Sequence, residues 1–197
     1  MKTWNEIKNE TLNLGFEKIK AYNKNKKAYI EAYNWAQEFI ASTIGGVLGR
    51  LELNVKGADR EVFDLEALAK EAGMEYVAFS EAGILDENNR CVDGWTLWDN
   101  TLLMMPEDFD GKAVLHLMVM PQRLTEPAAE TTPCQIPDKW AILMPYYMAN
   151  RLYLDDDAGK AGYYWNLAED MKMQLLAKEK AVSISIVGGV DVDGWCW

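Results

Sequence analysis

Apolar residues recur at helical spacing over the first part of the chain. Thr3 followed by Glu6 has the pattern of a capping box, in which each side chain pairs with the backbone amide of the other, and this predicts a helix over residues 4–14. The same spacing predicts a second helix over residues 27–43, whose end is marked by Gly45 and the glycine after it. Two amphipathic helices are therefore expected here.

The hydrophobic period changes to alternation from residue 47 on. Leu51, Leu53 and Val55 alternate with polar residues, which is typical of a strand with one buried face. Further strands are expected over residues 75–80, 96–98, 101–104 and 112–120, with a helical turn over residues 64–69. Residues 96–104 predict a hairpin, because the Asp and Asn between its strands tolerate the positive φ of a tight turn.

Helical spacing returns in the last third of the chain. Four prolines within residues 121–137 first predict a long surface connection. A helix is then expected from about residue 138, kinked at Pro145 because proline removes an amide donor and crowds the preceding turn. Three consecutive aspartates, Asp155 to Asp157, interrupt this pattern, and a last helix is expected over residues 157–180.

The final segment, residues 182–197, has a pattern of its own. Val182, Ile184 and Ile186 alternate with serines. A glycine pair, Val190 and a closing Trp195-Cys196-Trp197 follow. This alternation predicts a short strand, which cannot bury its apolar face alone. The segment is therefore expected either to fold back on its own body or to add to the sheet of another chain.

Together these patterns predict an α+β fold. A helical body is expected to form from the N- and C-terminal helices, with a small β-rich domain inserted between them and an extended C-terminal tail. The expected boundaries assign residues 1–46 to the N-terminal helices, 47–134 to the inserted β-rich domain, 135–181 to the C-terminal helices and 182–197 to the tail.

The sequence predicts neither a membrane span nor a secretory signal. The longest strongly apolar run, residues 141–149, is well short of the roughly 20 residues that a membrane helix requires. The polar first residues lack the apolar core of a signal peptide, so the chain is expected to stay in the cytoplasm where it is made. Cys91, Cys134 and Cys196 are odd in number and far apart, so free thiols are expected rather than a disulfide framework or a zinc site.

Charge narrows the choice of partners. The chain has 20 Lys and Arg against 31 Asp and Glu, a net charge of −11, which argues against binding to duplex DNA or RNA. The N-terminal 27 residues are an exception, with an excess of basic residues: Lys2, Lys8, Lys18, Lys20, Lys24, Lys26 and Lys27 against Glu6, Glu10 and Glu17. Such an end is either a solvated helix face or a surface that meets an acidic partner.

Residues with catalytic potential are few. His116 is the only histidine and lies on an apolar strand, which favours a packed core position over a base or a metal ligand. The carboxylates of Asp155 to Asp157 are of the type that binds Mg²⁺ or Ca²⁺, although consecutive residues point in different directions and helix capping accounts for them better. No phosphate-binding loop is present, so neither a cofactor nor an enzyme is expected.

One long segment carries a family resemblance. Residues 136–157 contain Pro145-Tyr146-Tyr147 and end in Asp155-Asp156-Asp157, and a helix with Tyr163-Tyr164-Trp165-Asn166 follows. This stretch resembles the head–tail connector proteins of tailed bacteriophages, in which a kinked helix of the Leu-Pro-Tyr-Tyr type ends in an acidic step. Residues 3–8 and 103–111 also resemble that family, so the similarity extends over most of the chain.

The resemblance implies a structural virion protein. Connectors of the adaptor, or tail-tubular, type form a ring beneath the portal, expected to be twelvefold, that joins the capsid vertex to the tail. The implied partners are the portal protein, a tail or nozzle protein, other copies of the chain, and passing DNA that is not bound specifically. The implied location is the virion neck, after assembly in the host bacterial cytoplasm. Docking on the portal or a neighbouring subunit is then expected from Ile184, Ile186, Val190, Trp195 and Trp197.

Two alternatives belong to other functional classes. One is a small metal-dependent hydrolase that uses the cluster Asp155 to Asp157 together with His116. The other is a host-directed binding protein or inhibitor whose acidity mimics nucleic acid, and whose binding would weaken steeply with salt.

Overall fold

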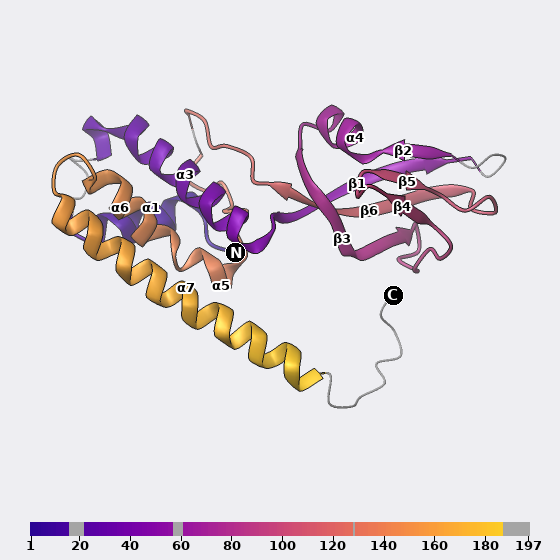
Figure 1. Cartoon of the computed structure of the whole chain (residues 1–197). Helices are drawn as coiled ribbons and strands as arrows, with labels where there is room; N and C mark the ends of the chain where they lie inside the picture. The colour runs from indigo at the N-terminus through magenta and orange to yellow at the C-terminus, as the bar shows by residue number, and fades with distance from the viewer. Residues whose placement is uncertain (16–21, 57–60, 128, 187–197) are drawn as a thin grey trace. The chain divides into compact units, whose positions relative to one another are not determined.

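The computed structural model describes residues 1–15, 22–56, 61–127 and 129–186, and its fold is α+β, as the sequence predicted (Figure 1). The helices are α1 Trp4–Asn13, α3 Lys26–Ile44, α4 Leu65–Glu71, α5 Asp138–Ala141, α6 Met144–Tyr153 and α7 Ala158–Ile186. The strands are β1 Val47–Val55, β2 Val62–Asp64, β3 Glu75–Asp86, β4 Thr96–Trp98, β5 Leu102–Met104 and β6 Gly111–Met120. Among the described residues, contacts define a helical unit, residues 1–40 and 122–186, and a β unit, residues 41–121.

Helix α1 begins at the predicted capping box. The Glu6 amide donates to the Thr3 hydroxyl at 3.3 Å, and the Thr3 amide donates to the Glu6 carboxylate at 2.7 Å. These bonds satisfy two amides that the first turn of a helix leaves without partners, and they lower the pKa of Glu6. The next residue, Trp4, is buried with its ring edge-on to Tyr33 of α3 at 5.0 Å, so the cap fixes α1 where its first aromatic enters the core.

The segment predicted as a surface connection is largely exposed, and it also belongs to the helical unit. Asn34 of α3 donates from its amide group to the Leu124 carbonyl at 2.9 Å and accepts from the Leu124 amide at 2.7 Å. Farther along, Cys134 and Ile136 are completely buried. The prolines keep this segment out of a helix. Its buried side chains include those of Leu124, Cys134 and Ile136, and a buried side chain of α3 supplies the backbone partners that a sheet would otherwise give.

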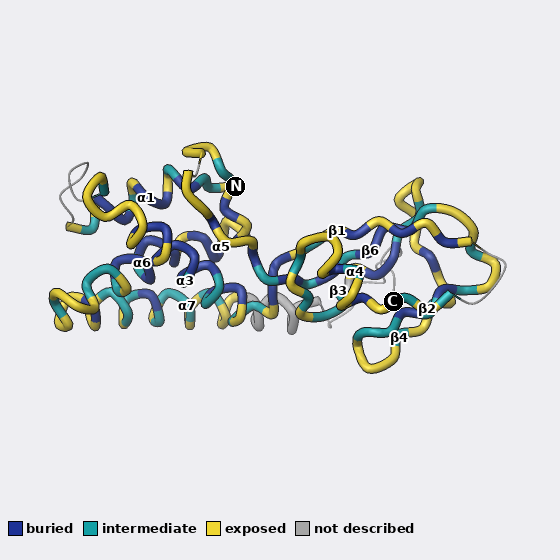
Figure 2. Tube along the Cα trace, turned by 90° about the horizontal axis from the view of Figure 1, so that it is seen from above, coloured by how far each residue is buried: buried dark blue, intermediate teal, exposed yellow. Residues whose placement is uncertain are grey.

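The predicted kink at Pro145 is a break between two helices. Helix α5 ends at Ala141, and Pro145 lies in the first turn of α6, where a missing amide costs no hydrogen bond. The Trp140 and Ala141 amides both donate to the Pro137 carbonyl, which closes the short α5 turn. Figure 2 shows that buried positions of the helical unit lie along α3, α5 and α6, so the break changes the chain's direction inside the core.

The β unit contains two antiparallel three-stranded sheets. Strand order is β1-β6-β3 in one and β2-β5-β4 in the other, which confirms the central position predicted for β6. Leu115 and Leu117 of β6 are completely buried, and Leu51 of β1 is paired with Leu115. The predicted hairpin β4–β5 is also present: Asp99 and Asn100 both have positive φ, at 49° and 59°, as the twist of a two-residue turn requires.

The prediction for the start of the C-terminal tail is wrong. Residues 182–186, expected as a strand, form the last five residues of α7. This helix has 29 residues and a length of roughly 43 Å at 1.5 Å per residue. The helix continues because residues 177–181, Ala-Lys-Glu-Lys-Ala, are strong helix formers. No glycine or proline lies between Gly162 and Gly188 to end it. Residues 187–197 lie outside the described part of the chain.

The two units divide at other positions than the predicted domain boundaries. The last turn of α3, from Ala41, has its contacts with the β unit, whereas the boundary was expected after residue 46. On the return, the helical unit begins at Gln122 rather than at residue 135, because residues 122–134 pack on α3.

Two glycines give opposite predictions for stability. Gly46 has φ of +108°, and an added Cβ would lie 3.1 Å from the Val119 carbonyl, so Gly46→Ala is expected to destabilise the chain by about 1–3 kcal/mol. Gly162 lies in α7 with open space around it, so Gly162→Ala is expected to stabilise by about 0.5–1 kcal/mol through helix propensity. Urea unfolding followed by circular dichroism measures both; equal midpoints would contradict this account of Gly46.

Candidate functional site

The residues of the connector-like motif have a structural role within the helical unit. Pro145 and Tyr147 are buried in α6, and Tyr146 is half-buried. Tyr147 joins an aromatic cluster with Trp35 and Phe39 of α3 and Trp165 of α7, with ring centroids 5.0–6.5 Å apart. The motif therefore holds three helices together.

A polar network closes the edge of this aromatic cluster. The Tyr147 hydroxyl donates to Glu169 at 2.7 Å, and Glu169 also forms an ion pair with Lys172. Partial burial of Glu169 raises its pKa, but the bonds from Lys172 and Tyr147 outweigh burial, so its pKa is lower than usual. Burial and the bonded carboxylate raise the pKa of Tyr147, which keeps its hydroxyl a donor.

Cations lie over the outer rings of the same cluster. Lys172 is 5.4 Å from the centroid of the Phe39 ring, and the Arg151 guanidinium is 6.0 Å from that of Trp35. Such contacts are worth about 0.5–1 kcal/mol at exposed sites. Because every titratable group here is engaged in holding a neighbour, this arrangement is suited to a rigid scaffold.

Two tyrosines after the motif fix the end of α1. Tyr164 of α7 donates its hydroxyl to the Leu14 carbonyl, and Tyr153 of α6 donates to the Gly15 carbonyl at 3.3 Å. Their rings stack with centroids 5.8 Å apart. These carbonyls follow the end of α1 and accept no hydrogen bond from its amides. The tyrosines therefore supply donors to carbonyl groups that a helix end leaves without partners.

The aspartate cluster caps a helix. Asp157 accepts from the Lys160 amide at 3.0 Å at the start of α7, while Asp155 and Asp156 are exposed. Within residues 1–15, 22–56, 61–127 and 129–186, no group of three His, Cys, Asp or Glu side chains could hold a metal ion. The hydrolase alternative also needs His116, which belongs to the β unit.

His116 and the cysteines depart from the expectations in detail. His116 is half-buried, and its Nδ1 atom is buried without a hydrogen-bond partner among the described residues, so it is not the satisfied core residue expected. Cys91 is disulfide-bonded, which overturns the expectation of free thiols at that position. Cys134 is a free thiol, buried, and burial raises its pKa, so it is unreactive. Cys196 lies outside the described residues.

The predicted docking residues are only partly described. Ile184 and Ile186 lie on α7, so their spacing is that of a helix rather than of a strand. Val190, Trp195 and Trp197 lie outside the described residues, so the structure does not bring the five together. Along α7, Ala161 and Ala168 are buried, whereas Met173 is 63% exposed and Leu176 36% exposed.

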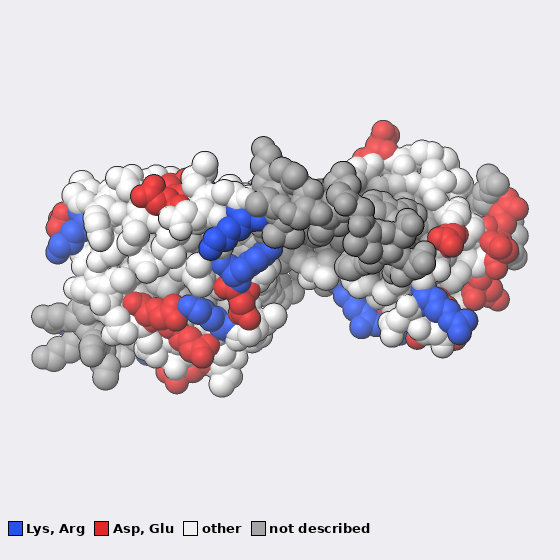
Figure 3. Space-filling view, turned by 90° about the horizontal axis from the view of Figure 1, so that it is seen from below, with Lys and Arg blue, Asp and Glu red and all other residues white. Residues whose placement is uncertain are grey.

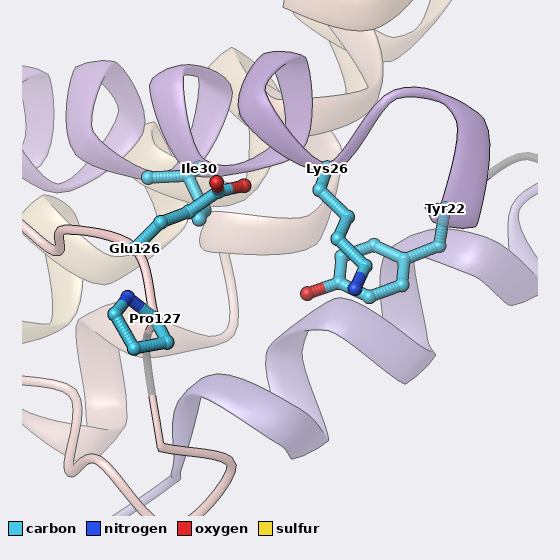
Figure 4. Close-up of a pocket in the computed structure, with 5 residues that line it drawn as sticks. All are labelled: Tyr22, Lys26, Ile30, Glu126 and Pro127. Atoms are coloured by element: carbon cyan, nitrogen blue, oxygen red, sulfur yellow. The ribbon is translucent and has the colours of Figure 1, made fainter.

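A pocket beside α3 was not predicted. It has a volume of about 430 Å³ and is lined by Tyr22, Lys26, Ile30, Glu126 and Pro127 (Figure 4). The only signal in the sequence was the lysine excess that includes Lys26, because Glu126 and Pro127 reach the pocket from far along the chain.

Charged side chains do not form a continuous basic surface on the face drawn in Figure 3, where Lys and Arg lie in small groups, some of them next to Asp and Glu. Among the described residues, no helix is both long and apolar enough to cross a membrane. No protein-family model and no curated protein sequence matches the chain.

The Tyr147–Glu169 bond gives a prediction for stability against pH. Tyr147→Phe is expected to destabilise the chain by about 1–2 kcal/mol at pH 7, since Glu169 loses a charge-assisted donor.

The pKa of Glu169 in the folded chain is below the ordinary value of 4.5, so its contribution to stability is present above pH 4.5 and is lost as the pH falls through the folded pKa. The stability difference between the wild type and Glu169→Gln should therefore shrink below pH 4.5 in urea unfolding. A difference that stays constant from pH 7 to pH 3 would contradict this role of Glu169.

Proposed function

We propose that the chain is a structural virion protein, a head-to-tail adaptor that forms a ring beneath the portal and joins the capsid vertex to the tail. The observation that carries the proposal is the last part of α7. Every described side chain from Leu176 to Lys178 is exposed, yet the helix continues to Ile186.

A helical segment of this kind needs a partner to be stable. Isolated helices shorter than about 12–15 residues are marginal in water, and most helix stability comes from packing of an apolar face. The sequence of the last turns, Ala181-Val182-Ser183-Ile184-Ser185-Ile186, is rich in β-branched apolar residues, which have low helix propensity. A surface of the portal or of a neighbouring subunit would supply an apolar partner for these residues.

The rest of the helical unit fits a structural role. The connector-like residues Tyr147, Tyr153 and Tyr164 all serve to lock α1, α3, α6 and α7 together. A subunit that withstands tail assembly needs such a rigid body. The net charge of −11 also suits a conduit, because an acidic wall does not hold the phosphates of passing DNA.

Electron microscopy of the protein mixed with the portal ring encoded by the same genome tests the proposal. The expected result is an added symmetric layer, twelvefold as the connector resemblance implies, below the portal. The layer should disappear with a chain that ends after Val182 and with the double variant Ile184→Asp, Ile186→Asp. The matched control is Ser183→Ala, Ser185→Ala, which changes the same turns without adding charge and should leave the layer intact.

Two outcomes would contradict the proposal. One is the absence of an added layer at every salt concentration with the wild-type chain, which would redirect attention to the two alternative classes. The other is a complete layer formed by the aspartate double variant, which would remove the end of α7 from the contact.

A further inference from the structure

The first turn of α3 carries charge that its own helix disfavours. Lys26 and Lys27 occupy this turn, which holds no acidic residue, and Lys24 lies just before it. The positive end of the helix dipole is at this terminus, so cations here lower helix stability. Lys27 has Glu31 at 3.9 Å, but Lys24 and Lys26 have no ion pair with any described residue. The Lys26 ammonium lies 5.9 Å from the centroid of the Tyr22 ring, and neither of these two exposed charges has a carboxylate partner among the described residues.

The 430 Å³ pocket opens beside these lysines and already has its shape. Its wall is Tyr22, whose ring is held by Tyr29 at 5.6 Å between centroids and by Lys8 at 4.7 Å. Lys8 itself is only 6% exposed and is paired with Glu130 at 3.3 Å. A wall built in this way does not need to rearrange when a ligand enters.

The pocket combines an apolar surface with one cation, Lys26, and one carboxylate, Glu126, and two further lysines, Lys24 and Lys27, stand beside Lys26 in the sequence. Ile30 and Pro127 give the apolar surface, and Figure 4 shows the Lys26 ammonium in front of the Tyr22 ring, with Glu126 and Pro127 across the opening. A suitable ligand is therefore an aromatic or aliphatic side chain with carboxylates next to it, which would lie toward Lys24, Lys26 and Lys27.

The chain carries such a group in its β unit. The turn between β5 and β6 reads Pro106-Glu107-Asp108-Phe109-Asp110, and its three acidic residues are exposed. Phe109 lies between them, half-buried, and its amide donates to the Pro106 carbonyl at 3.2 Å, which makes the turn compact. The turn thus offers one phenyl ring surrounded by three carboxylates.

We propose that the pocket of one copy binds the acidic turn of a second copy, with Phe109 against Ile30 and Pro127 and the carboxylates toward Lys24, Lys26 and Lys27. The two surfaces differ, so the contact is heterologous, and repeated contacts of this type generate rings or filaments. The inference deepens the proposed adaptor function, on which its biological meaning rests, by naming the surfaces that join neighbouring subunits.

A peptide of residues 105–111, labelled with a fluorophore, tests the contact with the full-length protein by fluorescence anisotropy. Saturable binding is expected, weakened at least tenfold by Lys26→Glu in the protein or by Phe109→Ala in the peptide. Raising NaCl from 50 to 500 mM should also weaken it several-fold, since exposed charges are screened. Lys178→Glu, an exposed charge reversal on α7, is the matched control and should bind like the wild type.

A charge exchange makes the assignment specific. Peptide with Glu107→Lys, Asp108→Lys and Asp110→Lys should fail to bind the wild type and should bind the variant Lys24→Glu, Lys26→Glu, Lys27→Glu. Circular dichroism and the unfolding midpoint show that each variant is folded. Absence of saturable binding to the wild type would overturn the proposal, as would equal binding of a scrambled peptide or of the Phe109→Ala peptide.

The peptide experiment contains no portal, so it is independent of the adaptor test. Peptide binding without an added layer on the portal would leave the subunit contact and reject the adaptor function. A layer on the portal without peptide binding would leave the adaptor function and reject this contact.

Discussion

One buried amide, Asn34, holds the chain where it returns to the helical unit. Its side chain both donates to and accepts from the backbone of Leu124, as a neighbouring strand would, and it is only 4% exposed. Gln37, one turn later, repeats the interaction with the Gln122 carbonyl at 2.8 Å. Without the Asn34 bonds, the two backbone groups of the buried Leu124 would be unpaired, at a cost of about 1–3 kcal/mol each. The place where the chain returns to α3 depends on them.

The aromatic cluster joins α3 to the other helices, as the two amides join it to the returning segment. Trp35 and Phe39 lie on the same helix as Asn34 and Gln37, so α3 presents polar partners to the returning segment and aromatic ones to α6 and α7. The helical unit is thus organised around one helix with two differently built sides. Its outer surfaces are then available for partners, and both proposals concern such surfaces: the end of α7 and the start of α3.

Local signals in the sequence predicted the elements that local chemistry determines. The Thr3–Glu6 box, the Asp99-Asn100 turn and the central β6 all depend on neighbours within a few residues or on a simple hydrophobic period. The sequence did not reveal that Pro145 starts a helix rather than kinks one, because this depends on where α5 ends. Nor did it reveal that residues 122–124 pack on α3, because the partners, Asn34 and Gln37, are about 90 residues away. The alternation from Val182 to Ile186 was misleading, since a helix already running through alanines and lysines continues through β-branched residues until a glycine.

The insertion of the β unit between Asn34 and its partner Leu124 has a consequence for the order of events during synthesis. All described strands of the β unit have left the ribosome by the time Met120 is exposed, so its antiparallel pairs can close before the helical unit is complete. The helices α1 and α3 are made earliest but must wait for residues 122–178 before their aromatic side chains are covered. The part of the molecule translated first is therefore the part completed last. Until residues 122–178 have been made, the apolar faces of α1 and α3 that these residues will cover stay exposed.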